Sequence, residues 1–124
     1  MLDRYLASNR GKSFEWGVTD CFTFCIKWAD LITGNDVMSQ YRYSSVQEGI
    51  DIIKKAGFSY SWEVFDLHYA RTEKPVVGDL VAIDSESING VGATGIKIKN
   101  GIMSVSNRGV AYIDKPIIAT WRVK

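Results

Sequence analysis

Helical and strand patterns are separated along this chain rather than alternating. Apolar residues recur at helical spacing within residues 2–69, whereas short runs of apolar and β-branched residues follow within residues 80–123. Alternating helices and strands would predict a parallel sheet, but a helical half followed by a strand half is typical of the α+β class. We therefore expect N-terminal helices packed on a C-terminal antiparallel sheet, in a single domain that spans residues 1–124.

The most apolar helical pattern begins at Cys21. Thr19 or Asp20 can cap this helix, and Gly34 can end it. Because its residues are apolar on nearly every side, the helix is expected to be buried.

Three further helical patterns flank this one. A short helix is expected at residues 2–7. Ser45 begins a capping-box pattern, and the helix behind it is expected to end at Gly57. A last helix is expected at about residues 62–69, with Ser61 as its cap.

The second half of the chain predicts five short strands. They lie at residues 80–83, 94–98, 102–105, 110–113 and 119–123. Asn100-Gly101 predicts a tight hairpin with positive φ at both turn positions, and Asn107-Arg108-Gly109 predicts another turn.

Charge and composition exclude several classes of partner. The 15 basic and 14 acidic residues give a net charge of +1, too little for a surface that binds nucleic acid. The first residues are too charged for a signal peptide, and no apolar run is long enough to insert into a membrane, so we expect synthesis and folding in a cytoplasm. Two cysteines and one distant histidine do not form a recognisable zinc site, and no cofactor is expected.

Cys21 is the candidate nucleophile, because a helix start can stabilise a thiolate. The alternative is a cysteine that only packs in the core, which is the expected role of Cys25. Asp20 is better explained as a helix cap, and its charge would raise the pKa of the neighbouring thiol. His68, the single histidine, is a candidate base, but its alternative role is a half-buried ring bonded to a neighbour.

Several short motifs resemble, in order, those of NlpC-type cell-wall cysteine peptidases, a branch of the papain-like peptidases. The motifs are Trp16-Gly17, Asp20-Cys21, Gly78-Asp79-Leu80 and Thr94-Gly95-Ile96, and the resemblance covers about residues 12–106. It implies a papain-like NlpC-type fold with Cys21 at the position of the nucleophile.

The chain departs from this family at the general base. The resemblance places Ala93 where the family has its catalytic histidine, and downstream only Ser104, Ser106 or Asn107 could stand at the third polar position. Without an imidazole, proton transfer to the leaving amine lacks a donor, so hydrolysis of a peptide bond should be very slow.

The wider pattern, including Trp28-Ala29-Asp30, Tyr41-Arg42 and Thr120-Trp121-Arg122, resembles small phage proteins related to that peptidase family. This resemblance implies a structural role in the tail tip of a virion, synthesis in the bacterial host cytoplasm, and contact with phage tail hub or fibre proteins and with the host cell envelope. The alternative is an active cysteine peptidase or amidase that cleaves peptidoglycan peptides during host entry. A third hypothesis is that a pocket at the start of the helix binds a small ligand or a peptide terminus without turnover.

Overall fold

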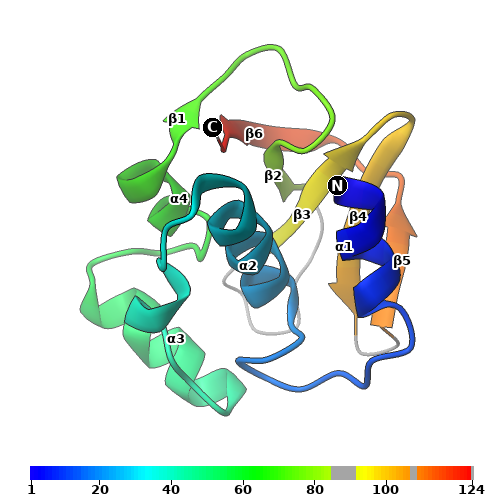
Figure 1. Ribbon diagram of the computed structural model, residues 1–124. Coiled ribbons are helices and arrows are strands. Elements are labelled where there is room, and N and C mark those ends of the chain that lie inside the picture. Colours follow the sequence, from blue (N-terminus) through cyan, green and yellow to red (C-terminus); the bar gives the residue numbers. More distant parts are fainter. Residues whose placement is uncertain (85–91, 107–108, 124) are drawn as a thin grey trace.

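The computed structural model describes residues 1–84, 92–106 and 109–123, and these residues form helices on one side of a sheet (Figure 1). The helices are α1 (Leu2–Asn9), α2 (Cys21–Thr33), the short 3₁₀ helix η1 (Met38–Gln40), α3 (Val46–Lys55) and α4 (Glu63–His68). The strands are β1 (Ala70–Arg71), β2 (Leu80–Ile83), β3 (Ala93–Ile98), β4 (Gly101–Ser106), β5 (Gly109–Ile113) and β6 (Ile117–Arg122).

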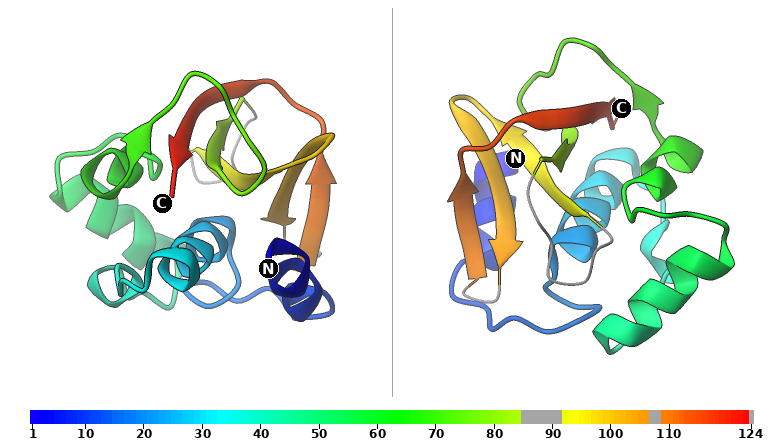
Figure 2. Two further views of the ribbon diagram at one scale, coloured as in Figure 1. Left: turned by 45° about the horizontal axis from the view of Figure 1, so that its top comes forward. Right: turned by 180° about the vertical axis from the view of Figure 1, so that it is seen from behind.

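The strands form one antiparallel sheet in the order β1-β6-β2-β3-β4-β5. All four residues of β2 are buried, because Leu80 and Ala82 belong to the main core on one face of the sheet and Val81 and Ile83 to a smaller apolar cluster on the other face. The sheet curves strongly, and in the left-hand view of Figure 2 it arches over the helices with β1 on one side and β5 on the other. The expected α+β class, with helices in the first part and an antiparallel sheet in the second, is confirmed.

Helix α2 lies in the middle of the molecule, between the sheet and the pair α3 and α4 (Figure 1). Asp20 is its N-cap and accepts a hydrogen bond from the Thr23 amide at 2.8 Å, as a capping carboxylate should. Gly34 ends the helix with a φ of 76°, a left-handed conformation that suits glycine. Most of the residues between them are buried, so the expected central helix and both of its ends are confirmed.

The Gly78-Asp79-Leu80 motif holds the sheet to this helix. The carbonyl of Gly78 accepts a hydrogen bond from the indole of Trp28 at 2.8 Å. Asp79 is buried and pairs with Arg122 of β6 at 2.7 Å, and its second oxygen accepts from the Val76 amide. A buried carboxylate needs such partners, so these residues serve the packing of β2 and β6.

The hairpin between β3 and β4 is present, but its turn differs from the prediction. Gly101 already pairs with Ile98, so Lys99 and Asn100 form the turn. Among the described residues, no residue other than glycine has a positive φ, and Gly101 is not one of the glycines that do. The outer end of the exposed Tyr112 ring lies over Gly101, where a Cβ would come within 2.4 Å of it.

Other boundaries differ by a few residues. Helix α1 continues to Asn9, two residues beyond the expected end, and β6 begins at Ile117 rather than at residue 119. The two-residue strand β1 was not expected from the sequence. Ser61 was expected to cap α4, but the N-cap is Trp62 and no side chain caps this helix. Residues 107 and 108 of the expected turn lie outside the described residues.

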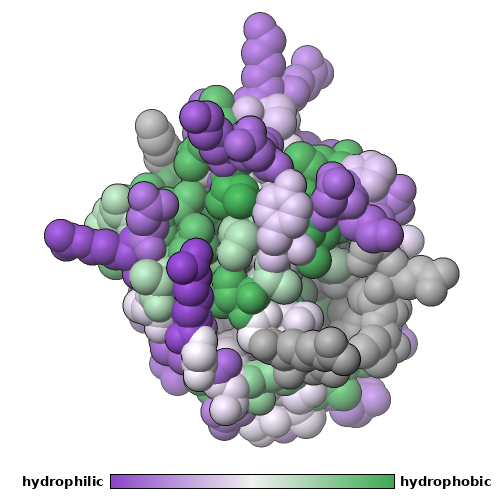
Figure 3. Space-filling view, turned by 90° about the vertical axis from the view of Figure 1, so that its right-hand side faces the viewer, coloured by the Kyte–Doolittle hydropathy of each residue, from purple (hydrophilic) through white to green (hydrophobic). Residues whose placement is uncertain are grey.

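The face of the sheet opposite α2 carries a second, smaller apolar cluster of Val81, Ile83 and Ile102. On the side of the molecule next to β5, hydrophobic residues gather near the middle and long hydrophilic side chains project around them (Figure 3). None of the helices in the described ranges has the length and apolar character that crossing a membrane would require.

Candidate functional site

Asp20 organises the chain around the start of α2. Its side chain is 2% exposed and accepts hydrogen bonds from four donors. These are the amide of Gly17, the amide and hydroxyl of Thr23, and the hydroxyl of Tyr43. The carboxylate therefore ties the loop before α2, the helix itself and the segment after η1 to one point, as a helix cap rather than as an acid or base.

Cys21 follows this cap directly, at the first position of α2. The thiol is half-buried, and burial is the largest cause that raises its pKa above the ordinary value. The backbone amide of Thr94 favours the thiolate, whereas the charge of Asp20 opposes it, and the net effect is a raised pKa. At neutral pH the sulfur is therefore protonated, and the helix N-terminus does not activate it.

Cys25 lies one turn farther along α2 and is completely buried. Burial raises the pKa of its thiol well above the ordinary value. The Thr94 hydroxyl is also buried and lacks a hydrogen-bond partner of good geometry, but it lies close enough to favour the thiolate of both cysteines. Cys25 thus packs between the helix and the sheet and is not exposed to a substrate.

The residue of β3 that faces the thiols is Thr94, not Ala93. Side chains alternate between the two faces of a strand. Ile96 belongs to the main core beneath α2, which puts Thr94 on the same face. Ala93 packs instead against the smaller cluster on the opposite face. Ala93 was singled out as the position of the missing histidine, but a side chain there points away from Cys21.

The downstream polar candidates have other partners. Ser104 is buried, and its hydroxyl donates to the carbonyl of Thr94 at 2.6 Å. The hydroxyl of Ser106 lies 3.5 Å from the carbonyl of Gly109, across the β4–β5 pair. Asn107 lies outside the described residues. The two serines therefore support the sheet, and the structure does not bring either of them to Cys21.

His68 lies at the other end of α2. It borders the same surface hollow as Ile32 and Thr33. At about 1.5 Å per residue, Ile32 is roughly 16 Å along the helix axis from Cys21. The Nε2 atom of His68 is 2.9 Å from the hydroxyl of Tyr41. The ring is thus half-buried and bonded to a neighbour, and it does not reach the thiol.

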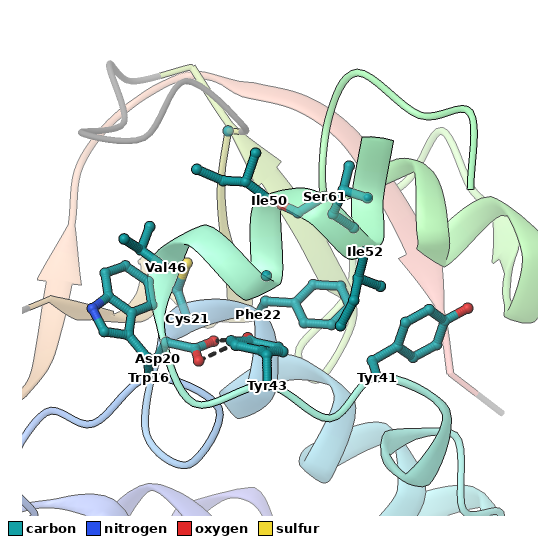
Figure 4. Close-up of a pocket in the computed structure, with 13 residues that line it drawn as sticks. Trp16, Asp20, Cys21, Phe22, Tyr41, Tyr43, Val46, Ile50, Ile52 and Ser61 are labelled. Carbon is teal, nitrogen blue, oxygen red and sulfur yellow. Dashed lines mark hydrogen bonds between the residues drawn. The ribbon is translucent and has the colours of Figure 1, made fainter. Parts of the chain in front are cut away.

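A small pocket opens over Cys21, between the start of α2 and α3. In Figure 4, Val46 and Ile50 lie above Cys21, whereas Asp20 and Tyr43 lie below it. The cavity has a volume of about 50 Å³. The lining residues are mostly apolar or aromatic, and they include Trp16, Phe22, Tyr41, Ile53, Ser61 and Gly92.

The described residues do not supply a set of metal ligands at this site. Within the described ranges, no three His, Cys, Asp or Glu side chains come together closely enough to hold a metal ion. The described groups at the site are a thiol with a raised pKa and a mostly apolar pocket beside it.

Three residues of the site were not recognised as such from the sequence. From the sequence, Thr94 stands only as part of the Thr94-Gly95-Ile96 motif and Ser61 as a candidate helix cap, and Tyr43 has no predicted role. The alternation of β3 could have separated Thr94 from Ala93, since Ile96 and Ile98 mark the core face of this strand. No local signal indicates that Tyr43 would reach Asp20, because that contact depends on how the chain returns after α2.

Comparisons with known proteins give one match. Neither the curated proteins nor the solved structures contain a significant match to this chain. A family profile described as a domain of unknown function, DUF6950, matches residues 1–123. Because the match covers nearly the whole sequence, the chain belongs to the DUF6950 family.

Proposed function

We propose that this protein is a structural or assembly component of a phage tail tip, with an NlpC-like fold that no longer performs hydrolysis. The observation that carries the proposal is the set of described groups around the Cys21 sulfur. The side chains among them are Thr94, which cannot act as a base at neutral pH, and Asp20, whose charge disfavours a thiolate.

Peptide-bond hydrolysis by a cysteine requires two proton transfers. A base must remove the thiol proton, and an acid must protonate the leaving amine. In cysteine peptidases one imidazole performs both steps, and here His68 is held by Tyr41 at the far end of α2. Asp20 cannot substitute, because its oxygens already accept from four donors that hold the local fold.

The residues that resemble the peptidase family support a retained scaffold. Gly78 and Asp79 hold β2 against Trp28 and Arg122, and Asp20 caps α2. Each of these contacts stabilises the body of the protein rather than a reacting group. These contacts are consistent with a protein that keeps a peptidase-like fold for assembly and does not catalyse hydrolysis.

The tail-tip part of the proposal comes from the resemblance to phage proteins, and it is tested by location. In a host that produces the phage encoding this chain, a tagged protein should sediment with assembled virions and remain bound after washing with high salt. Recovery only in the soluble fraction, with virions free of the tag, would contradict a structural role.

The absence of hydrolysis is tested separately on peptidoglycan fragments. The purified protein and its Cys21→Ala variant should release the same background amount of free amine, while an active cell-wall peptidase serves as the positive control. Release that requires Cys21 would instead establish the alternative, a cysteine peptidase. Because His68 is remote and is the single histidine, an imidazole base for such an enzyme would have to come from a partner chain.

A further inference from the structure

The described residues that line the pocket over Cys21 include no free charged group. Asp20 is the single carboxylate among them, and four donors already satisfy its oxygens. No lysine, arginine or histidine is among these described lining residues. A charged ligand would lose its hydration here without gaining an ionic partner, so the pocket favours an uncharged group.

Ser61 supplies a polar group that has no role within the described fold. It is 5% exposed, and it lines the pocket. The sequence suggests a helix cap, but α4 begins without a side-chain cap and the carboxylate of Glu63 binds the amides of Ser59 and Tyr60. No hydrogen bond joins the Ser61 hydroxyl to another described residue, yet it is not one of the completely buried polar atoms without a partner, which among the described residues are the hydroxyls of Tyr69 and Thr94. The Ser61 hydroxyl therefore meets solvent through the pocket that Ser61 lines, where a ligand can take the place of water as its hydrogen-bond partner.

The size of the cavity limits what can enter it. A cavity of about 150 Å³ holds one benzene molecule, and this one has about 50 Å³. A whole metabolite does not fit, whereas a branched group of about three carbons does. The occupant is then the tip of something larger, such as one side chain of a protein segment.

We propose that this pocket receives a valine-sized aliphatic side chain of a partner protein, with the Ser61 hydroxyl bonded to the backbone amide next to that side chain. The inference rests on the assembly role proposed above and names the partner chemistry for the same site. Cys21 forms part of the wall and takes no part in bond formation.

The probe for the test is N-methylisobutyramide, which joins an isopropyl group to an uncharged amide. Isobutyrate and isobutylammonium are the charged controls of similar size. Binding to the full-length protein is followed by methyl NMR of Val46, Ile50 and Ile53, which border the pocket. We expect saturable shifts at these methyl groups with the amide, and affinities at least about tenfold weaker with both charged molecules, because neither finds an ionic partner.

Two variants locate the binding. Ser61→Ala should weaken the affinity for N-methylisobutyramide about three- to tenfold, because one hydrogen bond is lost. Ser59→Ala, at an exposed serine outside the pocket, should leave this affinity unchanged. Val46→Phe should abolish the shifts by filling the cavity, and it provides the test if Ser61→Ala does not fold. Equal binding of isobutyrate, shifts confined to other surfaces, or unchanged binding by both pocket variants would overturn the proposal.

The result of the binding test can be distinguished from the result of the test for a role in the virion. Absence of amide binding in a protein that still sediments with virions would refute only the pocket inference. Amide binding by a protein that never enters virions would refute the tail role and leave the pocket chemistry standing.

Discussion

Tyr43 donates its hydroxyl proton to the carboxylate of Asp20, with its oxygen 2.8 Å from Oδ1 and 2.7 Å from Oδ2. The contact joins two segments that are 23 residues apart and closes the floor of the pocket beside Cys21. Burial and the charge of Asp20 raise the pKa of Tyr43 far above its ordinary value, so the phenol remains a donor across the physiological range.

Removal of this phenol should destabilise the protein. Tyr43→Phe is expected to lower the free energy of unfolding by about 1.5–3 kcal/mol, since a hydrogen bond to a buried charge is lost. Tyr60→Phe is the matched control, because Tyr60 is 45% exposed, and it should change stability by less than about 0.5 kcal/mol. Urea denaturation measures both. Equal effects of the two substitutions would show that the contact with Asp20 contributes nothing.

Gly17 should be far less tolerant of a side chain than Gly11. Both glycines have a positive φ, of 79° and 77°, but a Cβ on Gly17 would lie 1.8 Å from the carbonyl oxygen of Tyr43, and a Cβ on Gly11 meets nothing within 4 Å. Gly11→Ala should cost about 1 kcal/mol from its backbone conformation alone. Gly17→Ala should cost at least about 2 kcal/mol more, because the backbone must shift. Thermal unfolding of the two variants gives the difference, and similar melting temperatures would contradict the close approach.

The two faces of β3 can be distinguished by placing a histidine on each. In a Cys25→Ala background, Thr94→His puts an imidazole beside Cys21, whereas Ala93→His puts it on the opposite face. We expect iodoacetamide to alkylate Cys21 about tenfold faster at pH 7 in the Thr94→His protein, because a neighbouring imidazolium lowers the pKa of a thiol. The rate in Ala93→His should stay at the background level. Circular dichroism checks that both proteins fold, and acceleration by Ala93→His alone would reverse the assignment of the faces.

Asp66 should contribute to stability in a defined pH range. Hydrogen bonds from Arg71, and then from the Trp121 indole, lower its pKa below the ordinary value. The unfolded chain therefore takes up the proton first as the pH falls, so the contribution is complete above about pH 4 and is lost as the pH drops further. We expect Asp66→Asn to cost about 1 kcal/mol at pH 7, a modest value because the pair is largely exposed. Denaturation at pH 7, 4 and 3 should show this cost shrinking toward zero, and a constant cost would contradict the role of the charge.

Local signals in the sequence account for much of the fold. Asp20 and Gly34 mark the two ends of α2, because a cap and a left-handed stop depend on residues next to one another. The separation of helical and strand patterns likewise depends on periodicity within short windows and predicts the α+β class.

The interpretations that failed depend on contacts between distant segments. Asn100-Gly101 has the composition of a tight turn, but Gly101 pairs with Ile98 across the two strands, and the turn consists of Lys99 and Asn100. Ser61 has the composition of a cap, although the chain places it in the wall of a pocket. His68 forms a hydrogen bond with Tyr41, which directly follows η1 and lies 27 residues away in the sequence. The periodicity of the sequence does not predict such a contact. The sequence therefore identifies Cys21 as the centre of the candidate site, but it does not identify the residues that surround Cys21 in the fold.

The strand order has a consequence for biosynthesis. Strand β6 is the last of the described strands to be translated, yet it occupies the second place in the sheet, between β1 and β2. Until residues 117–122 have left the ribosome and joined the sheet, β1 and one side of β2 have no partner from this set of strands. An unpaired edge on a strand as apolar as Leu80–Ile83 invites association with other chains. A chain cut short before residue 117 should therefore aggregate rather than fold.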